Sequence, residues 1–318
     1  MYIKYPVTID PSIDTWDVQR NNFVTSSFPT SIYSSNTYIY TGYNSYFVST
    51  RGLVQFYLPS LPSDSKISSA TFKAYQTQVD ATNVSVDLNR ITSSWTSSVT
   101  WNPQPTIQST PEDTVTSNTS NAYWQWSITQ LVKDWYNGVV PNYGFMLKQQ
   151  NETTSPFRTF NTVNNGTNTP QLTINYTVDP IGIENYWGLT KDGVNPVNGN
   201  LVYQKNDLSI PGRGIPVSMI RTYNNRKSHV TGMFGYGWTS NVEKRLVDGG
   251  TGPITLIDED NTRHIFGQKI GGGYVAAGGD YLTLEKNGDG TYTITQTDGT
   301  KENYNAIGSR LGTFLYCP

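Results

Sequence analysis

Cysteine and histidine are scarce in this chain. Cys317 is its single cysteine, so no disulfide can form within the chain, and its place near the end makes it a poor candidate for a nucleophile. The two histidines, His229 and His264, lie far apart and belong to no HExxH motif or close ligand pair. These shortages exclude a disulfide-held scaffold and argue against a histidine-based metal centre. We expect neither a metal nor a cofactor.

Charge is also low. The 318 residues include 22 Lys and Arg against 24 Asp and Glu, a net charge of −2, and only 14% of them are charged. A nucleic-acid-binding protein needs a clustered basic excess, so this balance argues against a nucleic-acid partner. Ser, Thr, Asn, Gly and Tyr take the place of charge, a composition that suits β-rich extracellular proteins.

Long apolar runs are missing too. No segment approaches the roughly 18 apolar residues of a membrane span. The start, MYIKYPVTIDPSIDTWDV, has no basic region followed by an apolar one, so we identify no signal peptide. Its alternation instead predicts a first strand over residues 2–9, and a chain that begins inside a domain.

Period-two alternation, the pattern of half-buried strands, runs along most of the chain. In TNVSVDLNRIT, for example, Val84, Val86 and Leu88 share one face. One segment differs, because WSITQLVKDWYNG has its apolar residues at helical spacing, with Ser127 as the expected N-cap and Gly138 just beyond the end. The sequence predicts an all-β protein with one short helix.

The length of the chain favours two domains. Over residues 179–195 the alternation gives way to a stretch with Pro and Gly residues, which predicts a linker. Turn sequences follow at three places, residues 259–261, 287–290 and 298–299. We expect a jelly-roll-like β-sandwich over residues 1–178 and a β domain of hairpins and a meander over residues 196–318, with modest contact between them.

Four stretches of the first half carry a family pattern: TYIYTGYNSYFVSTRGLVQFYLPSLPSDSKISSATFKAY, NRITSSWTSSVTWNPQP, WSITQLVKDWYNGVVPNYGFMLK and PQLTINYT. In this order they resemble the DNRLRE domain, a β-sandwich module of bacterial surface proteins and of some polysaccharide-acting enzymes. The resemblance implies binding of a polysaccharide, which is acidic for some of these modules. Tyr57 departs from the family, which often has Asp there, so any role of that acid is absent.

The second half carries the motifs PGRG, RTYN and GYGW. Over about residues 190–305 it resembles the domain that opens Rhs-repeat and wall-associated proteins of bacteria, among them polymorphic toxins. In that family the domain precedes YD repeats, which wind a β-sheet into a shell around a C-terminal toxin. The resemblance implies that a downstream YD-repeat and toxin region is missing, and residues 310–318 predict a truncated reading frame.

Glycines flanked by prolines and aromatic residues mark residues 207–241. A phosphate-binding loop would need a further glycine, a following helix and a Lys-Ser/Thr pair, all of which PGRGIP lacks. We expect its glycines to set a sharp entry into a strand. Gly232, Gly235 and Gly237 are expected to bend the backbone between packed aromatic rings.

No motif of a catalytic site is present. There is no G-x-S-x-G elbow, and the acidic run DEDN at residues 258–261 lacks the glycine, the later Glu and the flanking helices of a calcium loop. We interpret DEDN as a hairpin turn and the lone His264 after it as a surface residue. We therefore expect no enzyme activity, although a pair of carboxylates for glycoside cleavage is defined only in three dimensions.

Aromatic residues offer a better lead, because sugar-binding modules stack sugar faces on exposed Trp and Tyr rings. Five tryptophans are expected in the core: Trp95, Trp101, Trp124, Trp126 and Trp135. The aromatic candidates for ligand binding are Trp16, Tyr38, Tyr40 and Tyr75. An acidic polysaccharide would also need basic side chains, and the candidates are Arg51, Lys73, Arg90, Lys148 and Arg158. These charges fit solvated strand edges equally well.

Three functions remain open. The first domain could bind a cell-wall or extracellular polysaccharide. Both domains could instead be the purely structural start of an Rhs shell that encloses a toxin, or an accessory part of a polysaccharide-degrading enzyme. All three place the chain outside the cell or in the cell wall. If the chain is the start of an Rhs shell, the strand near residues 301–305 is expected to be an unpaired edge, which the next repeat would cover.

Overall fold

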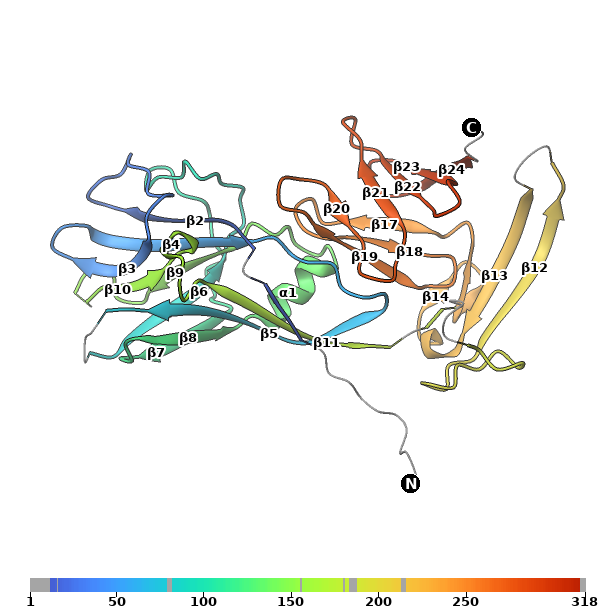
Figure 1. The fold of residues 1–318 in the computed structure, drawn as a ribbon, viewed down its shortest axis with the longest axis horizontal. Coiled ribbons are helices and arrows are strands. Elements are labelled where there is room, and N and C mark those ends of the chain that lie inside the picture. Colours follow the sequence, from blue (N-terminus) through green and yellow to red (C-terminus); the bar gives the residue numbers. More distant parts are fainter. Residues whose placement is uncertain are drawn as a thin grey trace, which may run out of the picture.

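The computed structural model describes residues 12–15, 17–78, 82–154, 156–179, 181–182, 188–212 and 216–314. Within these residues the protein is almost entirely β with one short α-helix, as the alternation predicts (Figure 1). The strand predicted over residues 2–9 lies outside the described residues. A sandwich forms the first half, and several small sheets form the second.

Two antiparallel sheets form the sandwich, and β3 (Tyr38–Asn44) belongs to both. The first sheet also contains β1 (Ser12–Thr15), β5 (Ser65–Gln76), β8 (Ala122–Ser127), β10 (Arg158–Asn161) and β11 (Gln171–Val178). The second also contains β2 (Val18–Thr25), β4 (Val48–Phe56), β6 (Val84–Arg90), β7 (Asp113–Ser117) and β9 (Phe145–Gln149). The inward-facing residues of both sheets make one core.

Strand β3 passes from one sheet to the other at Gly42. Residues 38–41 pair with β10, and residues 42–44 pair with β4. Gly42 has a φ of +96°, which glycine adopts without strain. A Cβ at this position would lie 2.4 Å from the side-chain amide carbon of Gln149, whose Nε2 donates to the Thr41 carbonyl at 2.9 Å. This bend lets one strand join both sheets.

Large aromatic side chains fill the space between the sheets. Trp124 and Trp126 on β8 are buried, as expected, and Trp126 Nε1 donates to the carbonyl of Val86 at 3.0 Å. The ring of Trp126 packs on Phe72 and Phe160, at centroid distances of 5.5 and 5.9 Å. Each such ring buries a large apolar area, so these contacts contribute strongly to the stability of the sandwich.

The segment between β6 and β7, residues 91–112, covers the outer face of the second sheet. Trp95 is buried there with Leu53 and Met146, as expected for a core residue. Trp101 packs against the same cluster but is only half-buried. The second sheet is therefore covered on both faces.

Helix α1 (Thr129–Tyr136) lies at the end of the sandwich nearest the second half (Figure 1). Its buried face consists of Leu131, Val132, Trp135 and Tyr136. The predicted N-cap is wrong: Ile128 is the N-cap, because Ser127 still belongs to β8 and pairs with Thr71. Gly138 follows the helix with a φ of +66°, as predicted.

Four small sheets form the second half. The first contains β12 (Val202–Ile210), β13 (Val217–Asn224) and β16 (Trp238–Ser240), and a hairpin contains β14 (Thr231–Gly232) and β15 (Gly235–Tyr236). The third contains β17 (Arg245–Asp248), β18 (Ile254–Ile257), β19 (Arg263–Gln268) and β20 (Tyr274–Val275). The fourth contains β21 (Thr283–Lys286), β22 (Tyr292–Thr295), β23 (Lys301–Tyr304) and β24 (Arg310–Phe314). Short 3₁₀ turns span Val163–Asn165 in the sandwich and Asn225–Lys227 in the second half. The predicted meander is confirmed as β21, β22 and β23.

The unpaired edge predicted near residues 301–305 is wrong. Strand β24 pairs with β23 along its whole length, so β23 lies inside its sheet. The sequence predicts β24 only weakly, because this strand begins with the charged residue Arg310 and not with an apolar one. Arg310 Nη2 lies 3.3 Å from the buried carboxylate of Glu302, and this ion pair compensates the charge.

The glycine-rich stretch of the second half bends and packs as expected. Gly235 and Gly237 have φ angles of +100° and +75°. A Cβ at Gly232 would lie 1.9 Å from the carbonyl oxygen of Trp238, so the close approach of two backbone segments requires glycine there. The centre of PGRGIP, residues 213–215, lies outside the described residues.

The two halves touch more extensively than the modest contact that the sequence predicts. Ile265 on β19 is buried within the core of the sandwich. The carboxylate of buried Asp64 accepts a hydrogen bond from the backbone N–H of Arg263 at 3.0 Å. A Cβ at Gly267 would lie 1.9 Å from the backbone nitrogen of Ser60. We call this contact of residues 58–67 and α1 with the β18–β19 hairpin the seam. The boundaries at 178 and 196 stay a prediction.

Candidate functional site

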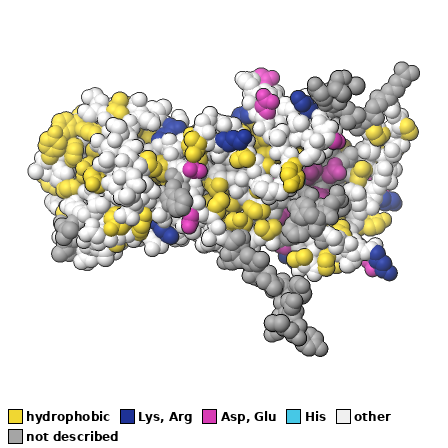
Figure 2. All heavy atoms as spheres, in the orientation of Figure 1, with side chains coloured by type: hydrophobic (Ala, Val, Ile, Leu, Met, Phe, Trp, Pro, Cys, Tyr) yellow, Lys and Arg dark blue, Asp and Glu magenta, His cyan; other side chains and the backbone are white. Residues whose placement is uncertain are grey.

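Six aromatic side chains gather at the end of the sandwich away from the seam, where Figure 2 shows hydrophobic side chains at the surface. They are Phe28, Tyr33, Tyr40, Tyr46, Phe47 and Phe157, and we call them the aromatic tip. The centroids of its neighbouring rings lie 4.9–6.3 Å apart. Tyr46 is 67% exposed, and the other five are half-buried. The tip is therefore a packed aromatic surface with one ring open to solvent.

The hairpin between β3 and β4 fixes this ring. The Asn44 side-chain oxygen accepts hydrogen bonds from the backbone N–H groups of Tyr46 at 2.9 Å and Phe47 at 2.6 Å. The hydroxyl of Thr25 donates to the carbonyl of Phe47. Val48 then has a φ of +58°, a strained conformation for a β-branched residue. Because such strain clusters at functional sites, it supports a role for this hairpin beyond joining two strands.

A buried ring beneath the aromatic tip also holds its side chains in place. Phe23, which is fully buried, stacks on Tyr33 at a centroid distance of 4.3 Å and meets Tyr40 edge-on at 4.9 Å. Rings held in this way lose little conformational freedom when a ligand stacks on them. Tyr40 was a candidate from the sequence, and Tyr38 lies on the same side of β3. Burial, and secondarily the neighbouring Tyr38, raise the pKa of Tyr40, so the phenol stays neutral at pH 7.

Lys73 and Tyr75 lie elsewhere, on the outer face of the first sheet. Tyr75 meets Tyr123 edge-on at a centroid distance of 5.2 Å, and Lys73 pairs across the strands with Gln125 and Gln171. We call these five residues the polar face. The structure therefore separates the sequence-predicted aromatic residues into two surfaces, and it adds Tyr123 to the second.

Arg51 and Lys148 share one carboxylate. The Arg51 guanidinium donates to both oxygens of Glu152, at 2.7 and 2.8 Å, and Lys148 Nζ lies 3.7 Å from the same group. Arg51 also donates to Gln104 at 3.0 Å and lies over the ring of Trp101 at 4.8 Å. These two cations are held by intramolecular partners, so they form no basic surface for an acidic polysaccharide.

The remaining basic candidates are no better placed. Arg90 lies 4.0 Å from Glu112 and donates to Gln108 at 3.3 Å. Arg158, expected on a sheet face, is fully buried and donates to the carbonyls of Phe157 and Thr82. Trp16 lies outside the described residues.

Tyr46, Phe28 and Phe47 were missed by the sequence reasoning. Their signal was available in part, since the run NSYF between two strands is a turn with two aromatic residues. Strand alternation assigns a face only within strands, and Phe28 and Tyr46 lie in loops. Phe28 and Tyr46 come into contact only because the two loops that carry them pack against each other.

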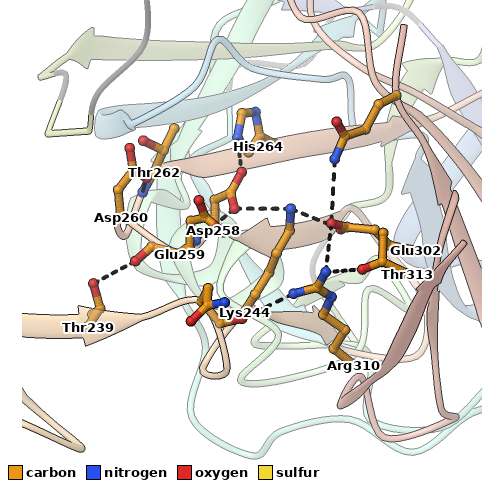
Figure 3. Close-up of polar contacts among 12 residues, drawn as sticks. Thr239, Lys244, Asp258, Glu259, Asp260, Thr262, His264, Glu302, Arg310 and Thr313 are labelled. Atoms are coloured by element: carbon orange, nitrogen blue, oxygen red, sulfur yellow. Dashed lines mark hydrogen bonds and ion pairs between the residues drawn. The ribbon is translucent and has the colours of Figure 1, made fainter. Parts of the chain in front are cut away.

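The densest group of ionisable side chains lies in the second half (Figure 3). Lys244 Nζ sits between Asp258, at 3.1 Å, and Glu302, at 2.9 Å. His264 Nδ1 lies 2.7 Å from Asp280, and its Nε2 lies 3.5 Å from Asp258. Lys244, Glu302 and His264 are almost fully buried, so their charges are mutually compensated rather than exposed to a substrate. We interpret this group, the ion cluster, as structural.

The ion cluster corrects one prediction and confirms another. His264, expected at the surface, is 5% exposed because two carboxylates compensate its charge. Residues 258–261 do form the predicted hairpin turn, with Asn261 at a φ of +71° and its N–H donating to the Asp258 carbonyl at 3.0 Å. In the part of the chain that the structure describes, no group of three or more acidic, His or Cys side chains could hold a metal ion.

We expect the His264→Gln variant to be less stable than the wild type by on the order of 2 kcal/mol at pH 7, because hydrogen bonds to a charged group are lost. Burial alone would lower the pKa of His264, but bonding to Asp258 and Asp280 raises it to about 10. A group whose pKa rises on folding stabilises fully below its unfolded value near 6.5, and this contribution is lost as the pH rises through 10.

Urea unfolding of the wild type and the His264→Gln variant between pH 6 and 10.5 tests this pH dependence of stability. The difference in the free energy of unfolding should shrink toward the alkaline end. A difference that stays constant over this range would show that His264 acts through packing alone.

Comparison with known proteins gives two family matches and several relatives. The model of carbohydrate-binding module family 96 (CBM96) matches residues 11–176, and that of a domain of unknown function, DUF6531, matches residues 191–266. The tRNA nuclease WapA of Bacillus subtilis is 35% identical over 136 residues, which are 41% of this chain and 6% of WapA. The tRNA3(Ser)-specific nuclease WapA of Bacillus spizizenii is 34% identical over the same length, again 6% of that protein.

These matches confirm a carbohydrate-binding module in the first half, and the DUF6531 model matches part of the second half. The chain spans only a small part of the length of the WapA relatives. The DNRLRE name and the Rhs-type setting stay predictions.

Proposed function

Because the chain belongs to carbohydrate-binding module family 96, we propose that its sandwich binds a cell-wall or extracellular polysaccharide through the aromatic tip. The observation that carries the assignment to the tip is the exposed ring of Tyr46 on a packed aromatic base. Apolar faces of sugar rings stack on such side chains, and the rigid hairpin keeps the cost in conformational entropy low.

The tip favours ligands with apolar sugar faces over strongly acidic ones. Four of the five basic residues predicted from the sequence are paired or buried, and none of them belongs to the tip. Lys73 on the polar face is the exception, so this face is the alternative surface for a ligand with carboxylates. Tyr75 and Tyr123 would supply its aromatic contacts.

We expect Tyr46→Ala to weaken binding to a polysaccharide about two- to tenfold, because one stacked ring contributes roughly 0.5–1.5 kcal/mol. The full chain is tested against a panel of soluble cell-wall and extracellular polysaccharides by affinity electrophoresis and calorimetry. Tyr236→Ala is the matched control, since Tyr236 is 68% exposed but lies in the second half. Its affinity should equal that of the wild type.

A Tyr123→Ala variant separates the two surfaces. If it loses binding and Tyr46→Ala does not, the ligand occupies the polar face and the assignment to the tip is wrong. If the wild type binds no polysaccharide of the panel, the structural role at the start of an Rhs-type shell replaces the binding role.

We further propose that the chain is non-enzymatic and acts outside the cell or in the cell wall. The ion cluster is the strongest assembly of ionisable groups that the structure describes, and its charges are buried and paired. No helix within the described residues is long and apolar enough to cross a membrane. Release of soluble sugar from a bound polysaccharide, or cleavage of tRNA, would overturn the non-enzymatic assignment.

A further inference from the structure

A cavity of ≈ 250 Å³ lies at the seam. Its walls come from both halves of the chain, with α1 and the start of β5 on one side and β19 on the other. Leu61, Tyr136 and Ile265 supply apolar surface, and Lys66, Lys133 and Arg263 supply three positive charges. Among the residues that the structure describes, no acidic side chain lines this cavity.

Two of these cations have no acidic partner within the structure's described residues. The guanidinium of half-buried Arg263 donates to the side-chain oxygen of Asn137 at 2.9 Å, and neither Arg263 nor Lys133 forms an ion pair with a described carboxylate. Burial lowers the pKa of Arg263, and the charge of Asp64 only partly opposes this. A partly desolvated guanidinium whose side-chain hydrogen-bond acceptor is a neutral amide is costly, and the charge of Asp64 offsets this cost only in part.

The two nearby carboxylates are committed to other groups. Asp64 accepts from the backbone N–H groups of Ile181 and Arg263, at 3.1 and 3.0 Å. Asp179 bonds to Lys66, and to Arg226 at 2.6 Å. Asp179 therefore compensates Lys66, whereas Lys133 and Arg263 are the lining cations without an ion-pair partner among the described residues.

A fourth cation, Lys227, interacts electrostatically with the lining cations Arg263 and Lys66. The pKa of Lys227 is lowered, chiefly by burial and then by the positive charge of Arg263, with Lys66 adding to the effect and Asp64 and Asp179 opposing it. Arg263 and Lys66 repel Lys227, so its charge adds to a positive potential that Asp64 and Asp179 compensate in part. An anion that enters would relieve this repulsion.

We propose that the seam cavity binds an oxyanion, a phosphate or carboxylate group, between Lys133 and Arg263. A guanidinium matches two oxygens of such a group, and an ammonium adds a point charge. The volume is below the roughly 300 Å³ at which sites for drug-sized ligands begin, so the cavity admits one charged group and not an oligosaccharide. Since its walls belong to both halves, the bound anion stabilises their contact.

The test uses the full chain and two probes, inorganic phosphate and glucuronate, with sodium chloride at matched ionic strength as the reference. We expect a saturable rise of the melting temperature with at least one probe, because a ligand that binds only the folded state stabilises it. Phosphate alone, or glucuronate alone, identifies which oxyanion the cavity accepts. A response no larger than that to chloride overturns the proposal.

Lys133→Gln tests the location, because Lys133 lies at the surface of α1 and its loss breaks no ion pair among described residues. We expect its affinity for the active probe to fall at least tenfold. Lys301→Gln, an exposed residue far from the seam along the chain, is the control. Equal affinities of the wild type and Lys133→Gln would overturn the assignment to this cavity. Tyr46→Ala should leave anion binding unchanged, which separates this site from the aromatic tip.

Discussion

Replacing Lys244 with methionine is expected to lower the free energy of unfolding by about 3–5 kcal/mol, the range found when one partner of a buried ion pair is removed. The side chain of Lys244 is 6% exposed and neutralises both Asp258 and Glu302. Methionine keeps most of the volume but leaves the buried carboxylate of Glu302 and the half-buried one of Asp258 with less compensation. Burial raises the pKa of Asp258, but bonding to His264 and the charge of Lys244 hold it well below its usual range.

Lys286→Met provides the control for this prediction. Lys286 Nζ lies 2.7 Å from Asp248, but its side chain is 36% exposed, and such a pair contributes at most about 1 kcal/mol. Chemical unfolding of the three proteins at pH 7 measures both differences. Similar losses for Lys244→Met and Lys286→Met would refute the view that the ion cluster holds the second half together.

A comparable effect is expected from Gly267→Ala. The new Cβ would meet the backbone of Pro59 and Ser60, at 2.3 and 1.9 Å, where no side chain can move aside. Overpacking of this kind costs roughly 3 kcal/mol, and it should separate β19 from the sandwich. We therefore expect the wild type to melt in one transition and Gly267→Ala to melt in two.

Gly278→Ala is the matched control, since a Cβ there meets no atom within 4 Å. Calorimetry measures the transitions, and limited proteolysis should cut Gly267→Ala between residues 178 and 195 faster than the wild type. If the wild type already melts in two steps, the halves are independent despite the seam. That result would restore the sequence-based expectation of modest contact between the halves.

Much of the fold could be predicted from local pattern. Val84, Val86 and Leu88 alternate in the sequence and are buried in the structure, because a strand between two layers must place every second side chain inside. Turns rich in Asn and Gly were also predictable from their backbone requirements. The contact of Asp64 with the backbone of Arg263 was not, because the two residues are 199 positions apart in the sequence.

The candidate site was less predictable for the same reason. Tyr40 and Tyr75 were selected as candidates from the sequence, which does not show that they lie on different surfaces. Arg51 is neutralised by Glu152, 101 residues further along the chain. Whether a charge is free for a ligand depends on such distant pairs, whereas strand alternation reports only on neighbours.

The length of β5 affects how a long polysaccharide could bind this protein. The strand begins next to the seam and extends 12 residues toward the aromatic tip, about 40 Å. A polymer that stacks on the tip and also offers a charged group to the seam cavity must reach from one end of the sandwich to the other (Figure 1). Chains shorter than that engage one end at a time, whereas longer ones gain avidity, since the first contact raises the effective concentration at the second. The sandwich would thus discriminate by polymer length as well as by sugar chemistry.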